Sequence, residues 1–177
     1  MSLDTRDITF AGAGVALLAV SAWVSLALGP VPFTLQTMAL AFVLCAMRPN
    51  QALASVLTYL VVGALGVPVF AGMRGGVGVL AGPSGGFLVG FAVAAALAVG
   101  VRRLVRSRGV SDACVVVLML VCSYGVGWAW LMASTGMGAA AAFASACAPF
   151  IVPDVMKCAA GIALARAVRR AVPSLVA

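Results

Sequence analysis

Six long runs of apolar residues, separated by short segments that hold most of the charges, constrain this chain more than any other feature. Only 8% of its 177 residues are charged, whereas a soluble domain carries roughly 25%. The mean hydropathy of +1.21 agrees with this scarcity of charge. So few charges cannot hydrate a globular surface, and we therefore expect an integral membrane protein whose exterior faces lipid.

The apolar runs predict a compact all-α bundle of six transmembrane helices, because a span takes about 17–25 apolar residues and six nearly exhaust the chain. The expected spans are 8–28, 35–47, 51–66, 85–105, 112–133 and 149–170. Residues 138–148 are expected to be helical, lying along the surface or extending the last span. We assign residues 1–177 to a single membrane domain. The first run is interpreted as a span and not as a cleavable signal, because the segment before it is not positively charged.

The arginines alternate with the spans and predict the orientation of the chain. With the N-terminus inside, nine arginines fall on the cytoplasmic side and only Arg74 lies in an external loop, a strong positive-inside bias. The nine are Arg6, Arg48, Arg102, Arg103, Arg106, Arg108, Arg166, Arg169 and Arg170. A nucleic-acid partner would need them on one water-exposed face, so we expect none. The prediction is a multi-pass protein of a bacterial-type cytoplasmic (plasma) membrane, with both termini inside.

The turn before the second span is the first of three features that interrupt the apolar runs, and the topology places all three outside. Pro30 and Pro32 stop the first helix, and Gln36 then presents an amide within or beside the next helix. A buried amide needs a hydrogen-bond partner. Taken alone, Gln36 is more typical of a helix–helix contact than of a ligand contact.

The second feature is the loop from Gly66 to Phe87, which combines eight glycines with several apolar side chains. Glycine lets the backbone approach a ligand closely, and irregular backbone at membrane depth is tolerated where it lines a cavity. The loop is either a lid over a pocket or a compact cap without a ligand. The local sequence favours neither.

The third feature is an acid and an amine at the start of the last span. Asp154 and Lys157 share one helical face because they are three residues apart. Pro153 at the first helical position would place Asp154 in the first turn, where the helix dipole stabilises a carboxylate. A charge at mid-bilayer costs about 3 kcal/mol on insertion scales, so we favour a binding role over mutual neutralisation. By contrast, an aromatic face of Tyr124 and Trp130 on the fifth span is better explained by interfacial anchoring when taken alone.

Together these segments resemble the BioY family, the biotin-specific S components of energy-coupling factor (ECF) transporters. Four motifs carry the resemblance: PVPFTLQT at 30–37, GVPVFAGMRGGVGVLAGPSGGFLVGF at 66–91, Y-x-x-G-x-x-W at 124–130 and P-F-x-x-x-D-x-x-K at 149–157. They stand in the family's order and spacing, from the first span to the last. Two departures are GPSGGF in place of GPTGGY, and Val152-Pro153 in place of proline-glycine.

The resemblance implies a high-affinity subunit that captures biotin from outside and has no enzymatic activity. The implied ligand contacts are Asp154, Lys157, Phe33, Gln36, Phe70, Gly72, Arg74, Gly82, Ser84, Gly85, Gly86, Phe87, Tyr124 and Trp130. Asp154 would accept a hydrogen bond from a ureido N–H of biotin. Lys157 would pair with the carboxylate or donate to a carbonyl. The sequence leaves open which end of biotin meets which residue.

The implied partners are a transmembrane coupling protein and two cytoplasmic ATPase subunits, because this chain has no G-x-x-x-x-G-K-[ST] phosphate loop of its own. Gly12 and Ala16 stand where the family has Ala-x-x-x-Ala and would let a helix of the coupling protein approach closely. The same small residues would equally suit packing within the chain. A homodimer is left open, and we expect no metal and no cofactor besides the transported biotin.

Three other functions stay open at this stage: an S component for another small vitamin or precursor, a ligand-free structural membrane protein, and an intramembrane enzyme. The enzyme is disfavoured because the chain has no histidine and only four acidic residues. Retention of biotin by the purified protein would separate the first two from a biotin-binding subunit.

Overall fold

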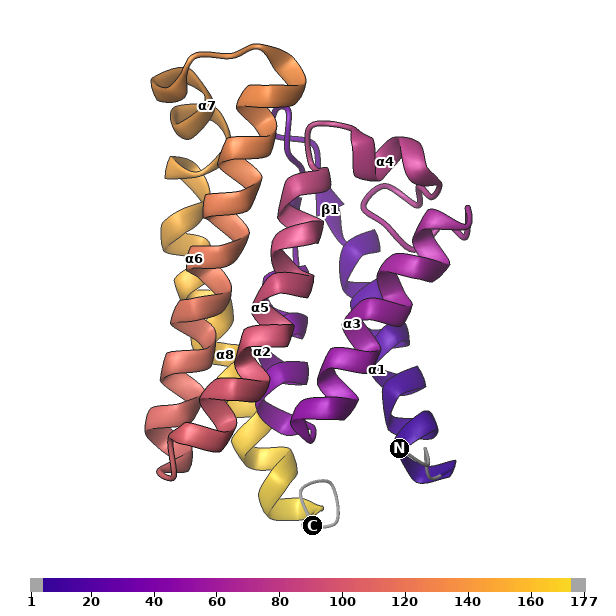
Figure 1. Ribbon diagram of the computed structural model, residues 1–177, viewed down its shortest axis with the longest axis vertical. Helices are drawn as coiled ribbons and strands as arrows, with labels where there is room; N and C mark the ends of the chain where they lie inside the picture. The colour runs from indigo at the N-terminus through magenta and orange to yellow at the C-terminus, as the bar shows by residue number, and fades with distance from the viewer. Residues whose placement is uncertain (1–4, 173–177) are drawn as a thin grey trace.

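The computed structural model describes residues 5–172, which are mostly helical (Figure 1). In chain order the elements are α1 (Thr5–Trp23), β1 (Ser25–Leu26), β2 (Phe33–Thr34), α2 (Gln36–Ala46), α3 (Pro49–Ala64), α4 (Val77–Ala81), α5 (Gly85–Leu104), α6 (Arg108–Thr135), α7 (Ala139–Ala146) and α8 (Ala148–Ala171). The predicted helical membrane fold is confirmed in outline, with two short strands and the short helix α4 added, and residues 138–148 are largely helical as expected.

Helix α2 forms the centre of the bundle. It contacts α1, α8, α6 and α3, while α5 and α6 form an extensively packed hairpin beside it (Figure 1). Eight of its eleven residues are buried, among them Leu40, Val43 and Leu44. Because apolar side chains surround α2 on all sides, its sequence shows no polar face.

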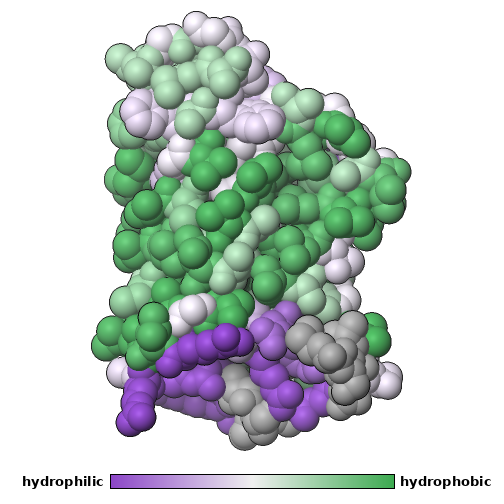
Figure 2. Space-filling model, in the orientation of Figure 1, coloured by the Kyte–Doolittle hydropathy of each residue, from purple (hydrophilic) through white to green (hydrophobic). Residues whose placement is uncertain are grey.

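Among the described residues, three helical segments are long and apolar enough to cross a bilayer: Gly85–Leu104, Arg108–Thr135 and Ala139–Ala171. Helix α2 is apolar, but its 11 residues span only roughly 16 Å, about half the thickness of the hydrocarbon core. Figure 2 shows a broad hydrophobic surface that ends in a hydrophilic band at one end of the molecule. The molecule is therefore built to sit in lipid.

The first helix is shorter than the expected span 8–28. Helix α1 ends at Trp23, and Ser25 and Leu26 instead pair antiparallel with Thr34 and Phe33. Gly29 in the connection has a φ of +130°, which only glycine adopts readily. The apolar run continues into this hairpin, so hydropathy alone does not mark the end of the helix.

The start of the last helix also differs from the prediction. Helix α8 begins at Ala148 with Pro149 in its first turn, so Pro153 lies inside the helix. Asp154 is therefore in the second turn, and the predicted stabilisation by the first-turn helix dipole is wrong. Residues 139–146 form the separate helix α7, which Cys147 divides from α8.

A buried carboxylate ties four helices together at the hydrophilic end. Asp112 at the start of α6 is fully buried, and its two oxygens lie 2.7 Å from Arg102 of α5 and 2.7 Å from Arg169 of α8. The same guanidinium groups donate to the carbonyls of Leu44, at 3.0 Å, and Cys45. The last carbonyls of α2, which have no partner within the helix, are thus satisfied by arginines that Asp112 holds in place.

Candidate functional site

A cavity opens at the other end of the same helices. The space not filled by atoms, counted together with the open mouth, is about 670 Å³. Nine of the predicted contacts line it: Phe33, Gln36, Phe70, Arg74, Ser84, Phe87, Tyr124, Asp154 and Lys157. The remaining lining residues are Val31, Pro32, Thr34, Thr37, Ala71, Val79, Leu88, Phe91, Ser123, Ala146 and Phe150.

Asp154 is held by three side chains. Its Oδ1 lies 2.5 Å from Nζ of Lys157 and accepts a hydrogen bond from the hydroxyl of Thr37 at 3.0 Å. Its Oδ2 accepts one from the hydroxyl of Tyr124 at 2.7 Å. A carboxylate has about four lone-pair sites, so Oδ2 retains capacity for one more donor. The carboxylate is thus fixed in position by α2, α6 and α8, with one acceptor site left for a ligand.

Lys157 is equally constrained. Its Nζ donates to the carbonyl of Thr34 at 2.7 Å and lies 4.0 Å from the ring centre of Phe33, a cation–π contact. The ring of Phe33 stacks on Phe150 with centroids 6.0 Å apart. The ammonium therefore has an anion, a carbonyl and an aromatic face around it, and its side chain is only 12% exposed.

Gln36 connects the cavity to the glycine-rich loop (residues 66–84). Its amide nitrogen donates to the hydroxyl of Tyr59 at 2.7 Å, and that hydroxyl donates to the carbonyl of Val69 at 3.0 Å. The ring of Phe70 packs edge-on against Tyr59 and directly over Gly63 of α3. Gln36 therefore makes the helix–helix contact predicted for it and also lies in the cavity wall.

The glycine-rich loop places Arg74 at the cavity. The N–H of Phe70 donates to the carbonyl of Arg74 at 2.9 Å, which closes a tight turn whose central residues Gly72 and Met73 have φ values of +70° and +55°. The Nε of Arg74 donates to the carbonyl of Ala71 at 3.3 Å. Arg74 has no acidic partner among residues 5–172.

Five of the predicted contacts do not line the cavity: Gly72, Gly82, Gly85, Gly86 and Trp130. Their contacts are with other parts of the protein. A Cβ on Gly85 would lie 1.7 Å from the carbonyl oxygen of Leu80, and one on Gly86 would lie 2.2 Å from Cβ of Trp130. The N–H of Gly72 donates to the hydroxyl of Ser25 at 3.2 Å.

Two tryptophans fasten the ends of the glycine-rich loop. The indole N–H of Trp23 donates to the carbonyl of Pro68 at 2.8 Å, and that of Trp130 donates to the carbonyl of Gly82 at 3.0 Å. The sequence suggested that Trp130 anchors the chain at the membrane interface. In the structure its indole N–H instead binds the backbone of the glycine-rich loop.

The family model of the BioY family matches residues 1–174, nearly the whole chain. The chain belongs to the BioY family.

Individual BioY proteins and a solved structure agree with this assignment. A Pyrococcus horikoshii protein named "Probable biotin transporter BioY" is 34% identical over 166 residues, which is 92% of this chain and 96% of that protein. A Thermotoga maritima protein named "Biotin transporter BioY" is 44% identical over 90 residues, 51% of this chain and 53% of that protein. The crystal structure of an S-component for biotin from an ECF-type ABC transporter has a TM-score of 0.84 at 22% identity, covering 93% of this chain and 91% of that one.

The motifs by which the sequence resembles BioY proteins meet around this cavity. Thr37, Ser123 and Phe150 are lining residues that the sequence analysis gave no role, although each lies in or directly beside one of those motifs. Gly12 and Ala16 both lie exposed on α1, and a Cβ on Gly12 would meet nothing within 4 Å. No contact within the described part of the chain therefore requires a glycine at position 12.

Proposed function

We propose that this BioY chain is the high-affinity biotin-binding, substrate-capture subunit of an ECF-type vitamin importer. The observation that carries the proposal is the Asp154–Lys157 pair, which lies in the wall of a cavity although both side chains are nearly buried. Buried ionisable residues are costly in a membrane protein and usually mark function. The names of its relatives and the fold of the biotin S-component support biotin as the ligand.

The charges around the cavity suggest how biotin would lie. Biotin has a ureido ring with two N–H donors, an apolar body and a carboxylate. The charge of Lys157 is already compensated by Asp154, whereas Arg74 is uncompensated. We therefore place the ligand carboxylate at Arg74 and a ureido N–H at the remaining acceptor site of Asp154. A hydrogen bond to a charged acceptor of this kind contributes about 1.5–3 kcal/mol.

Aromatic side chains would enclose the apolar body of the ligand. Phe70 reaches the cavity from the glycine-rich loop, Phe87 and Phe91 from α5, and Phe33 and Phe150 from the opposite side. The ring of Phe87 packs edge-on against Tyr124, with centroids 6.4 Å apart. Such a cavity, mostly apolar with a few polar groups, is typical of small-molecule sites.

We further propose that residues 1–177 form one membrane domain with six crossings and both termini in the cytoplasm. The arginines at the ends of α5, α6 and α8 lie at one end of the bundle and the cavity at the other, which supports an external cavity under the positive-inside rule. Helices α2 and α3 are too short to cross alone, so α1, α5 and α8 would shield their ends from lipid.

Transport would depend on a transmembrane coupling protein and two cytoplasmic ATPase subunits in the same cytoplasmic membrane. The exposed Gly12 and Ala16 of α1 would let a helix of the coupling protein approach closely. The chain itself would bind and release biotin without chemistry, metal or cofactor. A homodimer stays an alternative to this assembly.

Biotin binding by the purified chain tests the proposal. We expect about one biotin per chain to survive gel filtration in detergent, and other vitamins not to displace it. Retention of a different vitamin, with biotin ignored, would assign the chain to another substrate. Retention of no vitamin at all would favour a structural membrane protein.

A further inference from the structure

Ser123 of α6 differs from the other buried polar residues that the structure describes. Eight polar or charged residues are buried: Ser21, Gln36, Gln51, Ser55, Ser111, Asp112, Ser123 and Asp154. Seven of them form hydrogen bonds through their side chains. The hydroxyl of Ser123 has no hydrogen-bond partner among residues 5–172, although the residue is only 5% exposed.

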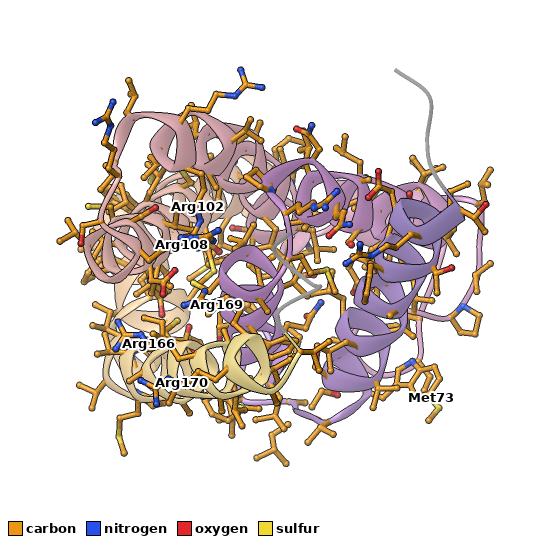
Figure 3. All side chains as sticks on the ribbon, turned by 90° about the horizontal axis from the view of Figure 1, so that it is seen from below. Met73, Arg102, Arg108, Arg166, Arg169 and Arg170 are labelled. Atoms are coloured by element: carbon orange, nitrogen blue, oxygen red, sulfur yellow. The ribbon has the colours of Figure 1, made fainter. Side chains whose placement is uncertain are left out.

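The other buried polar groups show how consistently this protein satisfies them. The hydroxyl of Ser55 donates to the carbonyl of Gln51 at 2.8 Å. Seen from below, Arg102 and Arg169 lie between the helices, where both donate to Asp112 (Figure 3). A buried hydroxyl without a partner destabilises the folded state. The serine at position 123 therefore needs a reason that an alanine would not meet.

Packing requires a small residue at this position but not a hydroxyl. A Cβ on Gly90 of α5 would lie 2.7 Å from Cα of Ser123, so the two helices are in close contact here. Alanine would fit the same space, because it lacks only the oxygen. Ser123 also lines the cavity. The hydroxyl is thus unexplained by the helix contact, and the space beside it is the cavity.

Along α6, Ser123 lies at the level of Asp154. The next residue, Tyr124, donates to Oδ2 of that carboxylate at 2.7 Å. Trp130, which binds the glycine-rich loop, is seven residues further along α6, and seven helical residues span about 10 Å. The same loop carries Arg74. Ser123 is therefore at the inner end of the cavity, near the carboxylate and far from this arginine.

Three hydroxyl groups lie at this end of the cavity, and only one of them keeps its proton free. Thr37 donates to Oδ1 of Asp154 at 3.0 Å, and Tyr124 donates to Oδ2. Each hydroxyl has a single proton to donate. The proton of Ser123 is the one that no group within residues 5–172 accepts.

The nitrogen donors beside these hydroxyls are also in use. The three N–H groups of Lys157 are matched by Asp154, a backbone carbonyl and an aromatic ring face. The amide nitrogen of Gln36 is turned toward the hydroxyl of Tyr59 in α3. A ligand that reaches the inner end of the cavity therefore meets an acceptor on Asp154 and a free donor on Ser123.

We propose that the hydroxyl of Ser123 donates a hydrogen bond to the ureido carbonyl of bound biotin and thereby selects for a cyclic urea. This inference rests on the function proposed above, in which a ureido N–H meets Asp154 and the ligand carboxylate meets Arg74. A ureido ring carries N–H donors beside a carbonyl acceptor, so it needs an acceptor and a donor at the same depth. Asp154 and Ser123 supply these two groups.

Isothermal titration calorimetry with Ser123→Ala tests the inference. The variant should bind biotin about tenfold more weakly, because the ureido carbonyl loses its donor. Dethiobiotin, which keeps the ureido ring but lacks the ring sulfur, should lose affinity by the same factor. Without ligand, the thermal unfolding temperature should equal or exceed that of the wild type, because an unpartnered buried hydroxyl is removed. A serine with a purely structural role would instead give a lower unfolding temperature and unchanged affinity.

The matched control is Ser55→Ala, which removes a buried serine hydroxyl that has a partner and lies outside the cavity. It should lower the unfolding temperature and leave biotin affinity unchanged. Unchanged biotin affinity in Ser123→Ala would overturn the inference. So would a loss seen with biotin but not with dethiobiotin, which would place the hydroxyl at the ring sulfur. A wild-type chain that binds neither ligand would overturn the proposed function itself, and the inference with it.

Discussion

Replacing Asp154 by asparagine keeps the shape of the side chain but removes its charge. In Asp154→Asn, Lys157 keeps its charge with only the carbonyl of Thr34 and the ring of Phe33 close to it. Breaking a buried ion pair on one side costs about 3–5 kcal/mol. The two side chains are 9% and 12% exposed, so we expect the free energy of unfolding to fall by roughly 3 kcal/mol, the lower end of that range.

The same replacement should weaken biotin binding between about 10- and 100-fold, because a ureido N–H loses a charged acceptor. The double variant Asp154→Asn/Lys157→Met separates the two effects. Removing both charges should return the stability to about the wild-type level, since a buried pair replaced by neutral residues is often neutral in stability. Biotin binding should stay weak in the double variant.

Denaturant unfolding in detergent measures the stability of each variant, and isothermal titration calorimetry measures its biotin affinity. Asp112→Asn is the matched control, because it removes a buried, arginine-paired carboxylate at the far end of the bundle. It should destabilise the chain while its folded fraction binds biotin normally. The reasoning is refuted if the double variant binds biotin as tightly as the wild type, or if Asp112→Asn weakens binding as much as Asp154→Asn.

Three further replacements test single contacts of the cavity. Tyr124→Phe removes a donor to the buried carboxylate, and calorimetry should show about a tenfold loss of biotin affinity with the fold retained. Arg74→Gln should weaken binding of biotin about tenfold but leave binding of biotin methyl ester unchanged, since the ester lacks the charge that the guanidinium meets; equal loss for both ligands would contradict the proposed orientation. Gly63→Ala would place a Cβ 2.1 Å from the ring of Phe70. This overpacking should destabilise the position of Phe70 by about 1–3 kcal/mol and speed the release of biotin in a chase experiment. The control Gly78→Ala, whose new Cβ would meet nothing within 4 Å, should leave the release rate unchanged.

The contact between Asp154 and Lys157 could be predicted from the sequence because it is local. Asp154 and Lys157 meet through helical spacing alone, and charges in an apolar span are conspicuous. The sequence did not predict that Thr37 and Ser123 line the cavity. Their positions depend on which faces of α2 and α6 turn toward the cavity, and packing between helices far apart in sequence decides this. The first-turn position predicted for Asp154 is wrong because the helix begins at Ala148, with Pro149 in its first turn and Pro153 inside it.

The glycines show a different limit of sequence reasoning. A glycine that admits a ligand and one that admits a neighbouring side chain look identical in a sequence. Gly85 and Gly86 lie against Leu80 and Trp130 and not against the cavity, because the loop folds back on its own helices. Only the three-dimensional arrangement distinguishes these two uses of a missing Cβ.

The indole bonds of Trp23 and Trp130 hold the two ends of the glycine-rich loop, at Pro68 and Gly82. Between these points Tyr59 and Ser25 bind Val69 and Gly72, so the segment that carries Phe70 can leave the cavity only when these two inner hydrogen bonds break. Biotin could then enter or leave through one small local movement while the helices keep their positions. The energetic cost of admitting a vitamin would then be limited to these local contacts.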